Sequence, residues 1–270
     1  DNTAPYIREN APKTATLNLG GTYALSMSKV FVDRDNDSLI YTVKVNDSEA
    51  ITVEDAYYTF TPDSIGTYTI TFVAKDSETE SDAHTVTLTV KEKSNSSSST
   101  PSTKWDISGD EIDGYVNISF TDNGKRVQGE SNVTYPKALG TIISSKRVPF
   151  TEGDTVADVT LRLLDAMDYS YQHTGTTKSG FYLASIGDFT LKGISYDSFG
   201  EFDAGVGSGW MITLNKTFIE YGASDFEVKN GDTIKWQYTC QLGADIGDPF
   251  YSGSSSSNKN NKTEDEKKEE

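Results

Sequence analysis

A short run of aspartates is the clearest candidate for site chemistry in this sequence of 270 residues. Asp33, Asp35 and Asp37 stand at alternate positions, and clustered carboxylates supply the oxygen ligands that a hard cation such as calcium prefers. An EF-hand is excluded, because Ser38 replaces the glycine of its sixth position and Lys44 replaces the glutamate of its twelfth. The run therefore indicates either a cation-binding loop of another kind or a solvated acidic turn.

A glycine-rich segment from Gly193 to Trp210 is the second candidate, and it also carries Tyr196, Phe199 and Phe202. Aromatic rings in such a loop can stack on a sugar or on a flat cofactor. Trp210 begins a predicted strand and is expected in the core. Tyr196 and Phe199 belong to no periodic pattern, so we expect them to face a ligand.

Motifs for catalysis are missing from the sequence. It contains no HExxH, P-loop, GxSxG or GxGxxG pattern, and 41 Asp and Glu residues make some carboxylate pair inevitable without identifying a glycosidase. Cys240 ends a predicted strand and is distant in sequence from His84 and His173, which favours a buried thiol over a nucleophile. We therefore expect no enzymatic activity.

The composition restricts the classes of partner. Lys and Arg number 24 against 41 acidic residues, and the formal charge of −17 argues against nucleic acid and anionic membrane surfaces. A single cysteine excludes an intramolecular disulfide and a multi-cysteine metal site. The mean hydropathy of −0.52 and the lack of an apolar run of about 20 residues predict a soluble protein without membrane insertion.

Low-complexity stretches divide the sequence. A Ser/Thr-rich run cannot bury enough apolar surface to offset its ordering entropy, so we expect a flexible linker within 93–111. The predicted globular domains cover 1–92 and 112–250, and a disordered tail or second linker covers 251–270. This organisation indicates a mature protein or a fragment of a longer multidomain protein.

The first globular segment is dominated by strand patterns. Apolar and polar residues alternate over 40–45, 68–73 and 85–90, and turn residues separate these runs. Short strands at this spacing in fewer than about 100 residues predict a Greek-key β-sandwich.

The second globular segment mixes one helix with several strands. Apolar residues recur at helical spacing from Val156 to Met167, with Asp154 or Thr155 as the expected N-cap and Asp158 completing a capping box. The expected strands cover residues 115–120, 209–215 and 233–239. One helix against several strands predicts a small α+β domain.

A family resemblance covers most of residues 1–92. Asp1-Asn2-x-Ala4-Pro5, Asp33-x-Asp35 and Ala74-x-Asp76 resemble the motif series of cadherin-type repeats, and the region around Asp33 is similar to bacterial dystroglycan-type modules. The resemblance implies an Ig/cadherin-like sandwich. It also implies calcium ligands, which on this sequence are Asn2, Asp33, Asp35 and Asp76, with Asp1 as a further candidate. Asp37 stands where many family members have glycine.

A second resemblance covers roughly residues 113–247. The segment from Glu201 to Met211 and the later motifs Asn230-Gly231-Asp232 and Trp236-x-Tyr238 resemble the bacterial DUF4430 family, which is similar to the C-terminal domain of transcobalamin and intrinsic factor. The resemblance implies a β-grasp-like α+β fold. It further implies that some relatives contact cobalamin at the positions of Trp210, Met211, Tyr221 and Gly222.

These observations support three functional hypotheses. The first is a non-catalytic piece of a bacterial cell-surface or secreted protein, in which a cadherin-like spacer, with calcium as its candidate cofactor, precedes a ligand-recognition domain. Adhesion or glycan binding would use exposed Tyr and Phe side chains together with Trp105. The second hypothesis is cobalamin binding by the C-terminal domain, and the third is a purely structural stalk. Neighbouring domains of a longer chain are expected partners of each.

Overall fold

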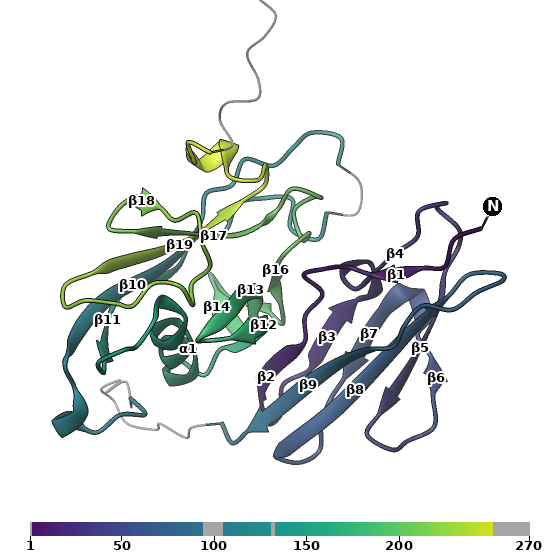
Figure 1. The fold of residues 1–270 in the computed structure, drawn as a ribbon, viewed down its shortest axis with the longest axis horizontal. Coiled ribbons are helices and arrows are strands. Elements are labelled where there is room, and N and C mark those ends of the chain that lie inside the picture. The colour runs from purple at the N-terminus through teal and green to yellow at the C-terminus, as the bar shows by residue number, and fades with distance from the viewer. Residues whose placement is uncertain (1, 94–104, 131–132, 251–270) are drawn as a thin grey trace, which may run out of the picture.

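The computed structural model describes residues 2–93, 105–130 and 133–250. Figure 1 shows two domains side by side, the N-terminal one in purple and blue and the C-terminal one in teal, green and yellow. Most of the linker predicted within 93–111 and the whole predicted tail lie outside the described residues. No helix among the described residues is long and apolar enough to cross a membrane.

The N-terminal domain is a β-sandwich, as predicted. Strands β2, β9, β8, β5 and β6 form one sheet, β3 pairs with β7, and β1 pairs with β4. The strands are β1 (Tyr6–Ile7), β2 (Thr14–Asn18), β3 (Tyr23–Ser26), β4 (Phe31–Val32), β5 (Ile40–Val45), β6 (Ile51–Thr52), β7 (Tyr57–Phe60), β8 (Gly66–Lys75) and β9 (His84–Lys91), with 3-10 turns η1 (Met27–Lys29) and η2 (Glu54–Ala56).

The predicted alternation of apolar and polar residues determines which side chains form the core of this sandwich. Every second residue of β9 is buried, including Val86 and Leu88, which are fully buried. Ile70 and Phe72 of β8 are also fully buried and belong to the same apolar cluster. Side chains alternate across a strand, so these residues face the interior while their threonine neighbours face out.

The C-terminal domain is a small α+β unit, which confirms the predicted fold class. Its five-stranded sheet has the order β11-β10-β19-β17-β18, and the first strand β10 lies parallel to the last long strand β19. The elements are η3 (Gly109–Glu111), β10 (Gly114–Asp122), β11 (Gly140–Phe150), α1 (Val156–Ala166), β12 (Ser170–Thr176), β13 (Ser179–Gly187), β14 (Phe189–Leu191), β15 (Ile194–Tyr196), β16 (Phe199–Gly200), β17 (Gly209–Leu214), β18 (Thr217–Phe218), β19 (Thr233–Thr239) and η4 (Ala244–Ile246).

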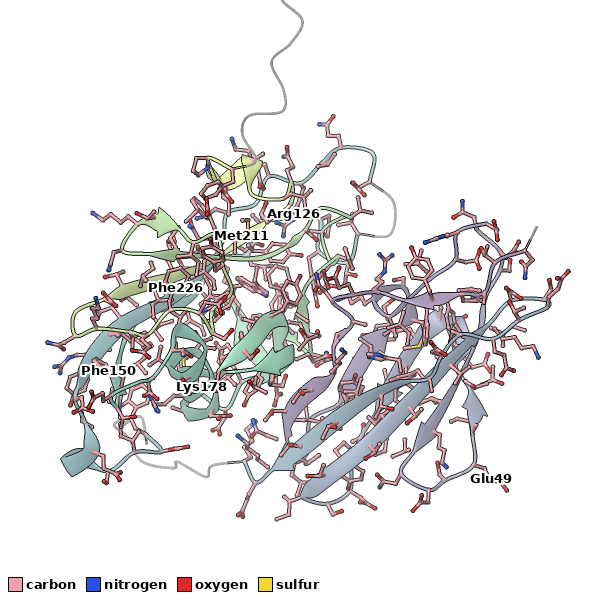
Figure 2. The ribbon with its side chains drawn as sticks, viewed as in Figure 1. Glu49, Arg126, Phe150, Lys178, Met211 and Phe226 are labelled. Carbon is pink, nitrogen blue, oxygen red and sulfur yellow. The ribbon has the colours of Figure 1, made fainter. Side chains whose placement is uncertain are left out.

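Helix α1 begins as the sequence indicates. Thr155 is the N-cap, and its hydroxyl and the Asp158 carboxylate form the predicted capping box, which satisfies backbone N–H groups that would otherwise lack partners. Lys178, labelled in Figure 2, donates to the same carboxylate at 2.7 Å. The apolar face of the helix carries Val159 and Leu163, which are fully buried in the domain core.

The two domains share one sheet. β2 pairs in parallel with β9 of its own domain and antiparallel with β12 of the other, with Thr16 opposite Tyr171. The result is a continuous eight-stranded sheet, β16-β13-β12-β2-β9-β8-β5-β6, and Figure 1 shows β2 and β12 adjacent where the domains meet. Two side-chain amides add hydrogen bonds across this contact: Asn18 donates to the carbonyl of Asp168, and Gln172 donates to the carbonyl of Ala24. The domains therefore pack together through backbone pairing as well as side chains.

Candidate functional site

The predicted acidic run forms a compact loop directly after β4. One carboxylate oxygen of Asp33, Oδ1, accepts the backbone N–H groups of Asp35 at 2.8 Å and of Asp37 at 3.1 Å. Asn36 adopts a positive φ of 58°, a conformation that asparagine tolerates. These bonds bend the chain so that carboxylate oxygens of Asp33, Asp35 and Asp37 lie within 4.8 Å of one another.

Two further predicted ligands lie next to this loop. The Asn2 amide donates to Asp76 Oδ2 at 3.1 Å, and both the backbone N–H and the hydroxyl of Thr3 donate to Asp35 Oδ2. The first residues of the chain thus connect residues 33–37, called the acidic loop below, to Asp76, which follows β8. The compact cluster consists of Asp33, Asp35 and Asp37, while Asn2 contacts Asp76 and its neighbour Thr3 contacts Asp35; Asp1 lies outside the described residues.

Hydrogen-bond donors around Asp76 and Asp35 favour the ionised forms of these two carboxyl groups. Backbone N–H groups of Thr79 and Glu78 hold the pKa of Asp76 at about 2, because they stabilise its charged form. The hydroxyl and the N–H of Thr3 lower the pKa of Asp35. Asp35 and Asp76 therefore contribute negative charge at this end of the sandwich.

Asp33 carries the feature that distinguishes this loop from a solvated acidic turn. It is 9% exposed, and its second oxygen, Oδ2, is buried without a hydrogen-bond partner. Leaving a buried charged oxygen unsatisfied is costly, so such groups normally have a partner. Among the described residues the cluster consists of three carboxylates, a set that fits a hard cation such as calcium better than zinc.

The aromatic segment does not form the expected exposed platform. Tyr196 is 7% exposed and stacks on Phe189 with ring centroids 5.0 Å apart. Phe199 is fully buried, with its ring centroid 4.3 Å from that of Tyr238. The expectation that Tyr196 and Phe199 face a ligand is wrong, because short strands β14, β15 and β16 fold the segment onto the domain core.

The remaining predicted ligand residues lie in different surroundings. Trp210 is buried, as expected for a core residue, and Met211 on the same strand is half-buried. Phe202 lies at the contact between domains, where the Arg8 guanidinium sits 5.0 Å from its ring centroid. Tyr221 is 67% exposed, and the neighbouring Gly222 donates its N–H to Asp225. Tyr221 is thus the most solvent-accessible ring of the predicted set. Outside that set, Trp105 is partly buried against the core.

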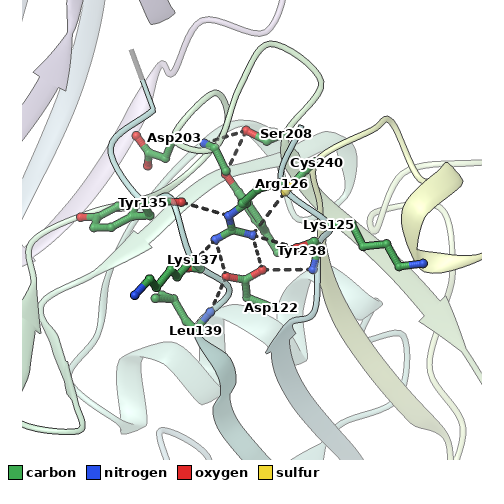
Figure 3. Close-up of polar contacts among 12 residues, drawn as sticks. Asp122, Lys125, Arg126, Tyr135, Lys137, Leu139, Asp203, Ser208, Tyr238 and Cys240 are labelled. Atoms are coloured by element: carbon green, nitrogen blue, oxygen red, sulfur yellow. Dashed lines mark hydrogen bonds and ion pairs between the residues drawn. The ribbon is translucent and has the colours of Figure 1, made fainter. Parts of the chain in front are cut away.

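A buried ion pair that the sequence analysis missed lies at the end of β10 (Figure 3). Asp122 is fully buried and binds Arg126 through two bonds of 2.8 and 2.7 Å, and it also accepts the Leu139 N–H. Arg126 further donates to the carbonyls of Tyr135 and Lys137 and contacts the sulfur of Cys240. A carboxylate four residues before an arginine was the only sequence signal for this pair.

This network is structural. Every named donor of Arg126 has a carbonyl, carboxylate or sulfur partner, so the guanidinium fastens the loop after β10 to the core. Burial raises the pKa of the Cys240 thiol, and this effect outweighs the opposing charge of Arg126. Cys240 is a buried free thiol, as predicted, and is poorly suited to act as a nucleophile.

A second group that the sequence analysis missed lies between the domains. Lys29 Nζ is 2.9 Å from Asp203 Oδ1, and both side chains are largely buried. Glu201 is 8% exposed, and burial raises its pKa, although the charges of Lys29 and Arg8 oppose this effect. Lys29 and Asp203 are 174 positions apart, so their pairing leaves no local signal in the sequence.

Comparison with known proteins identifies both domains. The chain carries a bacterial Ig domain over residues 2–89 and a domain of unknown function, DUF4430, over residues 153–240. No curated protein matches the sequence.

Two solved structures are similar to parts of the chain. One is the PKD domain of an M14-like peptidase from Thermoplasmatales archaeon SCGC AB-540-F20, with 25% identity over 34% of this chain and 100% of that domain and a TM-score of 0.26. The other is haptocorrin in complex with Cbi, with 13% identity, coverage of 48% of this chain and 26% of haptocorrin, and a TM-score of 0.28.

Proposed function

We propose that this chain is a non-catalytic part of a bacterial extracellular surface protein. Its Ig-like domain serves as a calcium-binding spacer, and its DUF4430 domain recognises a ligand in adhesion. The calcium assignment rests on Asp33 Oδ2, which is buried without a hydrogen-bond partner in the acidic loop. The bacterial Ig domain and the shared sheet between the domains support the role of a spacer.

The residues that would hold the cation follow from the contacts. Asp33, Asp35 and Asp37 offer carboxylate oxygens within 4.8 Å of one another, and Asp76 and Asn2 are the further candidates, since Asn2 contacts Asp76 and the following Thr3 contacts Asp35. Bound calcium would supply positive charge that offsets the repulsion among these aspartates. Because Asn2 and Thr3 lead into β1, the site would also fix the direction in which the chain enters the sandwich.

Thermal unfolding tests the calcium assignment. A cation that binds only the folded state raises stability, by about 2.7 kcal/mol at a concentration one hundred times its dissociation constant. We expect excess calcium chloride to raise the melting temperature above that measured with chelator, and Asp33→Asn to abolish this rise. Asp47→Asn is the matched control, since Asp47 is an exposed aspartate after the far end of β5. An equal rise in wild type and Asp33→Asn would contradict the assignment.

Ligand recognition by the C-terminal domain is the finer part of the proposal. Tyr221 is the exposed ring of the predicted set, and Phe226 lies beside it with ring centroids 6.5 Å apart. A glycan would stack on such a ring, whereas cobalamin would contact the half-buried Met211 and Gly222 together with Tyr221.

Calorimetric titration with oligosaccharides and with cobalamin separates these ligands. Saturable heat that Tyr221→Ala abolishes would support recognition of the titrated ligand. Lys216→Ala, an exposed substitution in the turn before β18, is the control. Silence with both ligands would contradict recognition of either class and favour a purely structural stalk.

A further inference from the structure

The buried Lys29–Asp203 pair differs from an ordinary surface ion pair. Lys29 is the last residue of η1 in the N-terminal domain, and Asp203 lies in the turn after β16 of the C-terminal domain. Their side chains are 14% and 10% exposed, whereas those of the pair Lys75 and Glu80 are 53% and 61% exposed. Removing water from a lysine and a carboxylate reduces the advantage of the charged pair over the neutral amine and acid.

The carboxyl group of Asp203 is held in one orientation. Its Oδ1 contacts the Lys29 amine at 2.9 Å, and its Oδ2 accepts the backbone N–H of Gly200 at 2.8 Å. The Gly200 backbone pairs with β13 and packs closely against it. A Cβ atom added at Gly200 would lie only 2.0 Å from the carbonyl oxygen of Ala184. The amine therefore lies at one oxygen of Asp203, while a backbone donor stabilises charge on the other.

A proton-carrying group accompanies this pair. Glu201, two residues before Asp203, is buried and hydrogen-bonded to Tyr182, and burial raises the pKa of its carboxyl group. It lies within the electrostatic influence of Lys29 and Arg8. The Phe202 ring and the Arg8 guanidinium pack together beside it, so aromatic and cationic groups border the site.

We propose that Lys29 and Asp203 condense into an intramolecular isopeptide bond that joins the two domains. The ion pair first exchanges a proton to give the neutral amine and the neutral acid. The amine nitrogen then attacks Cγ of Asp203, and the electron pair moves onto Oδ2 beside the Gly200 N–H. The protonated Glu201 gives its proton to Oδ1, which leaves as water, and then takes a proton from the nitrogen. The amine and the acid thus yield one amide and one water molecule, and no oxidant or cofactor is consumed.

Such a bond would provide a covalent cross-link within the chain, which a single cysteine cannot form. The chain cannot form an intramolecular disulfide, and the shared sheet depends on a short pairing of β2 with β12. A covalent link between residues separated by 174 positions would keep the domains together even after this pairing opens. This inference is independent of the calcium and ligand assignments.

Mass spectrometry of the intact, denatured chain tests the inference. We expect the wild type to be lighter than its sequence mass by one water molecule. Proteolysis should release two peptides that remain joined through Lys29 and Asp203. Lys29→Arg retains the positive charge but cannot form this bond, so its mass should equal its sequence mass. Glu201→Gln removes the proton carrier and should lower the joined fraction of freshly purified protein at least tenfold.

Several outcomes would overturn the inference or part of it. A folded wild-type chain with its full sequence mass contains an ion pair only, and the proposed bond is then wrong. A chain lighter by one water without a joined peptide indicates ring closure at another site, such as Asp113 before Gly114, and equally rejects the bond. If Glu201→Gln joins as completely as the wild type, Glu201 does not transfer the proton.

Discussion

The acidic loop at 33–37 and the aromatic segment at 193–210 are the two regions that the sequence singles out, and the structure treats them in opposite ways. The acidic loop stays at the end of its sandwich, where backbone N–H groups satisfy one oxygen of Asp33 and leave the other without a partner. The aromatic segment is enclosed, because Tyr196, Phe199 and Trp210 enter the core of its own domain and Phe202 packs at the contact with Arg8 of the other. Its carboxylate Asp203 meets Lys29 of the other domain.

This difference separates two uses of polar and aromatic residues. Like charges on one loop repel one another, and a cation from outside the chain can offset that repulsion. Carboxylates that face a lysine of another domain already have their counter-charge, so they contribute to joining the domains. The number of acidic residues in a segment therefore does not decide whether it binds a cation; the source of its partners does.

The largest effect is expected from truncating the enclosed segment. Phe199→Ala removes a fully buried ring that packs against Trp210 and Tyr238, and such substitutions cost about 3–5 kcal/mol of unfolding free energy. Urea unfolding measures this loss. The melting-temperature rise caused by calcium should be unchanged in the same variant, because the acidic loop lies in the other domain. A loss of under about 1 kcal/mol would show that Phe199 is not a core residue.

A smaller effect is expected from the pH dependence of Glu201. Its folded pKa is raised above its ordinary value of 4.5, so its folded environment favours the protonated form. The resulting stabilisation is fully present below pH 4.5 and is lost as the pH rises through the folded pKa. Urea unfolding at a series of pH values should show wild type losing stability relative to Glu201→Gln over this range.

The matched control for this pH dependence is Glu220→Gln, which replaces an exposed glutamate. Because Glu220→Gln retains Glu201, it should lose stability relative to Glu201→Gln over the same range, as the wild type does. A difference between wild type and Glu201→Gln that does not vary with pH would show that Glu201 is as solvated as Glu220.

The smallest effect is expected at the exposed ring. Tyr221→Ala should change the unfolding free energy by no more than about 0.5 kcal/mol, because Tyr221 is 67% exposed. Thermal unfolding of Tyr221→Ala and Phe199→Ala under the same conditions compares their losses of stability. A destabilisation similar to that of Phe199→Ala would place Tyr221 in the core and remove it as a candidate ligand residue.

Much of the fold follows from local patterns in the sequence. Strict alternation predicted β5, β8 and β9, and the helical spacing of Val156, Val159 and Leu163 with a Thr155 cap predicted α1. These elements are long enough for one buried face to repeat several times, which makes the pattern visible in a single sequence.

The enclosed aromatic segment could not be predicted in the same way. Strands of two or three residues, such as β15 and β16, are too short to show a period, so Tyr196 and Phe199 resembled loop residues. Their burial depends on which strands they meet, namely β14 and β13, and that information is not local.

For the candidate cation site, the sequence indicated part of the carboxylate cluster and not its decisive feature. Motif resemblance pointed to Asn2, Asp33, Asp35 and Asp76; in the structure Asp33 and Asp35 cluster with Asp37, and Asn2 contacts Asp76. Which oxygen of Asp33 is left unpartnered depends on the bonds to Asp35 and Asp37, which require atomic positions. The contact between Lys29 and Asp203 likewise depends on how two separately folded domains pack.

Isothermal titration of the chelator-treated chain with calcium chloride measures cation binding at the acidic loop itself. We expect saturable binding of calcium in the wild type, with this binding lost in Asp33→Asn and retained in Asp47→Asn. Absence of saturable binding in the wild type, or binding that survives in Asp33→Asn, would contradict the claim that the unpartnered Asp33 oxygen marks a cation site.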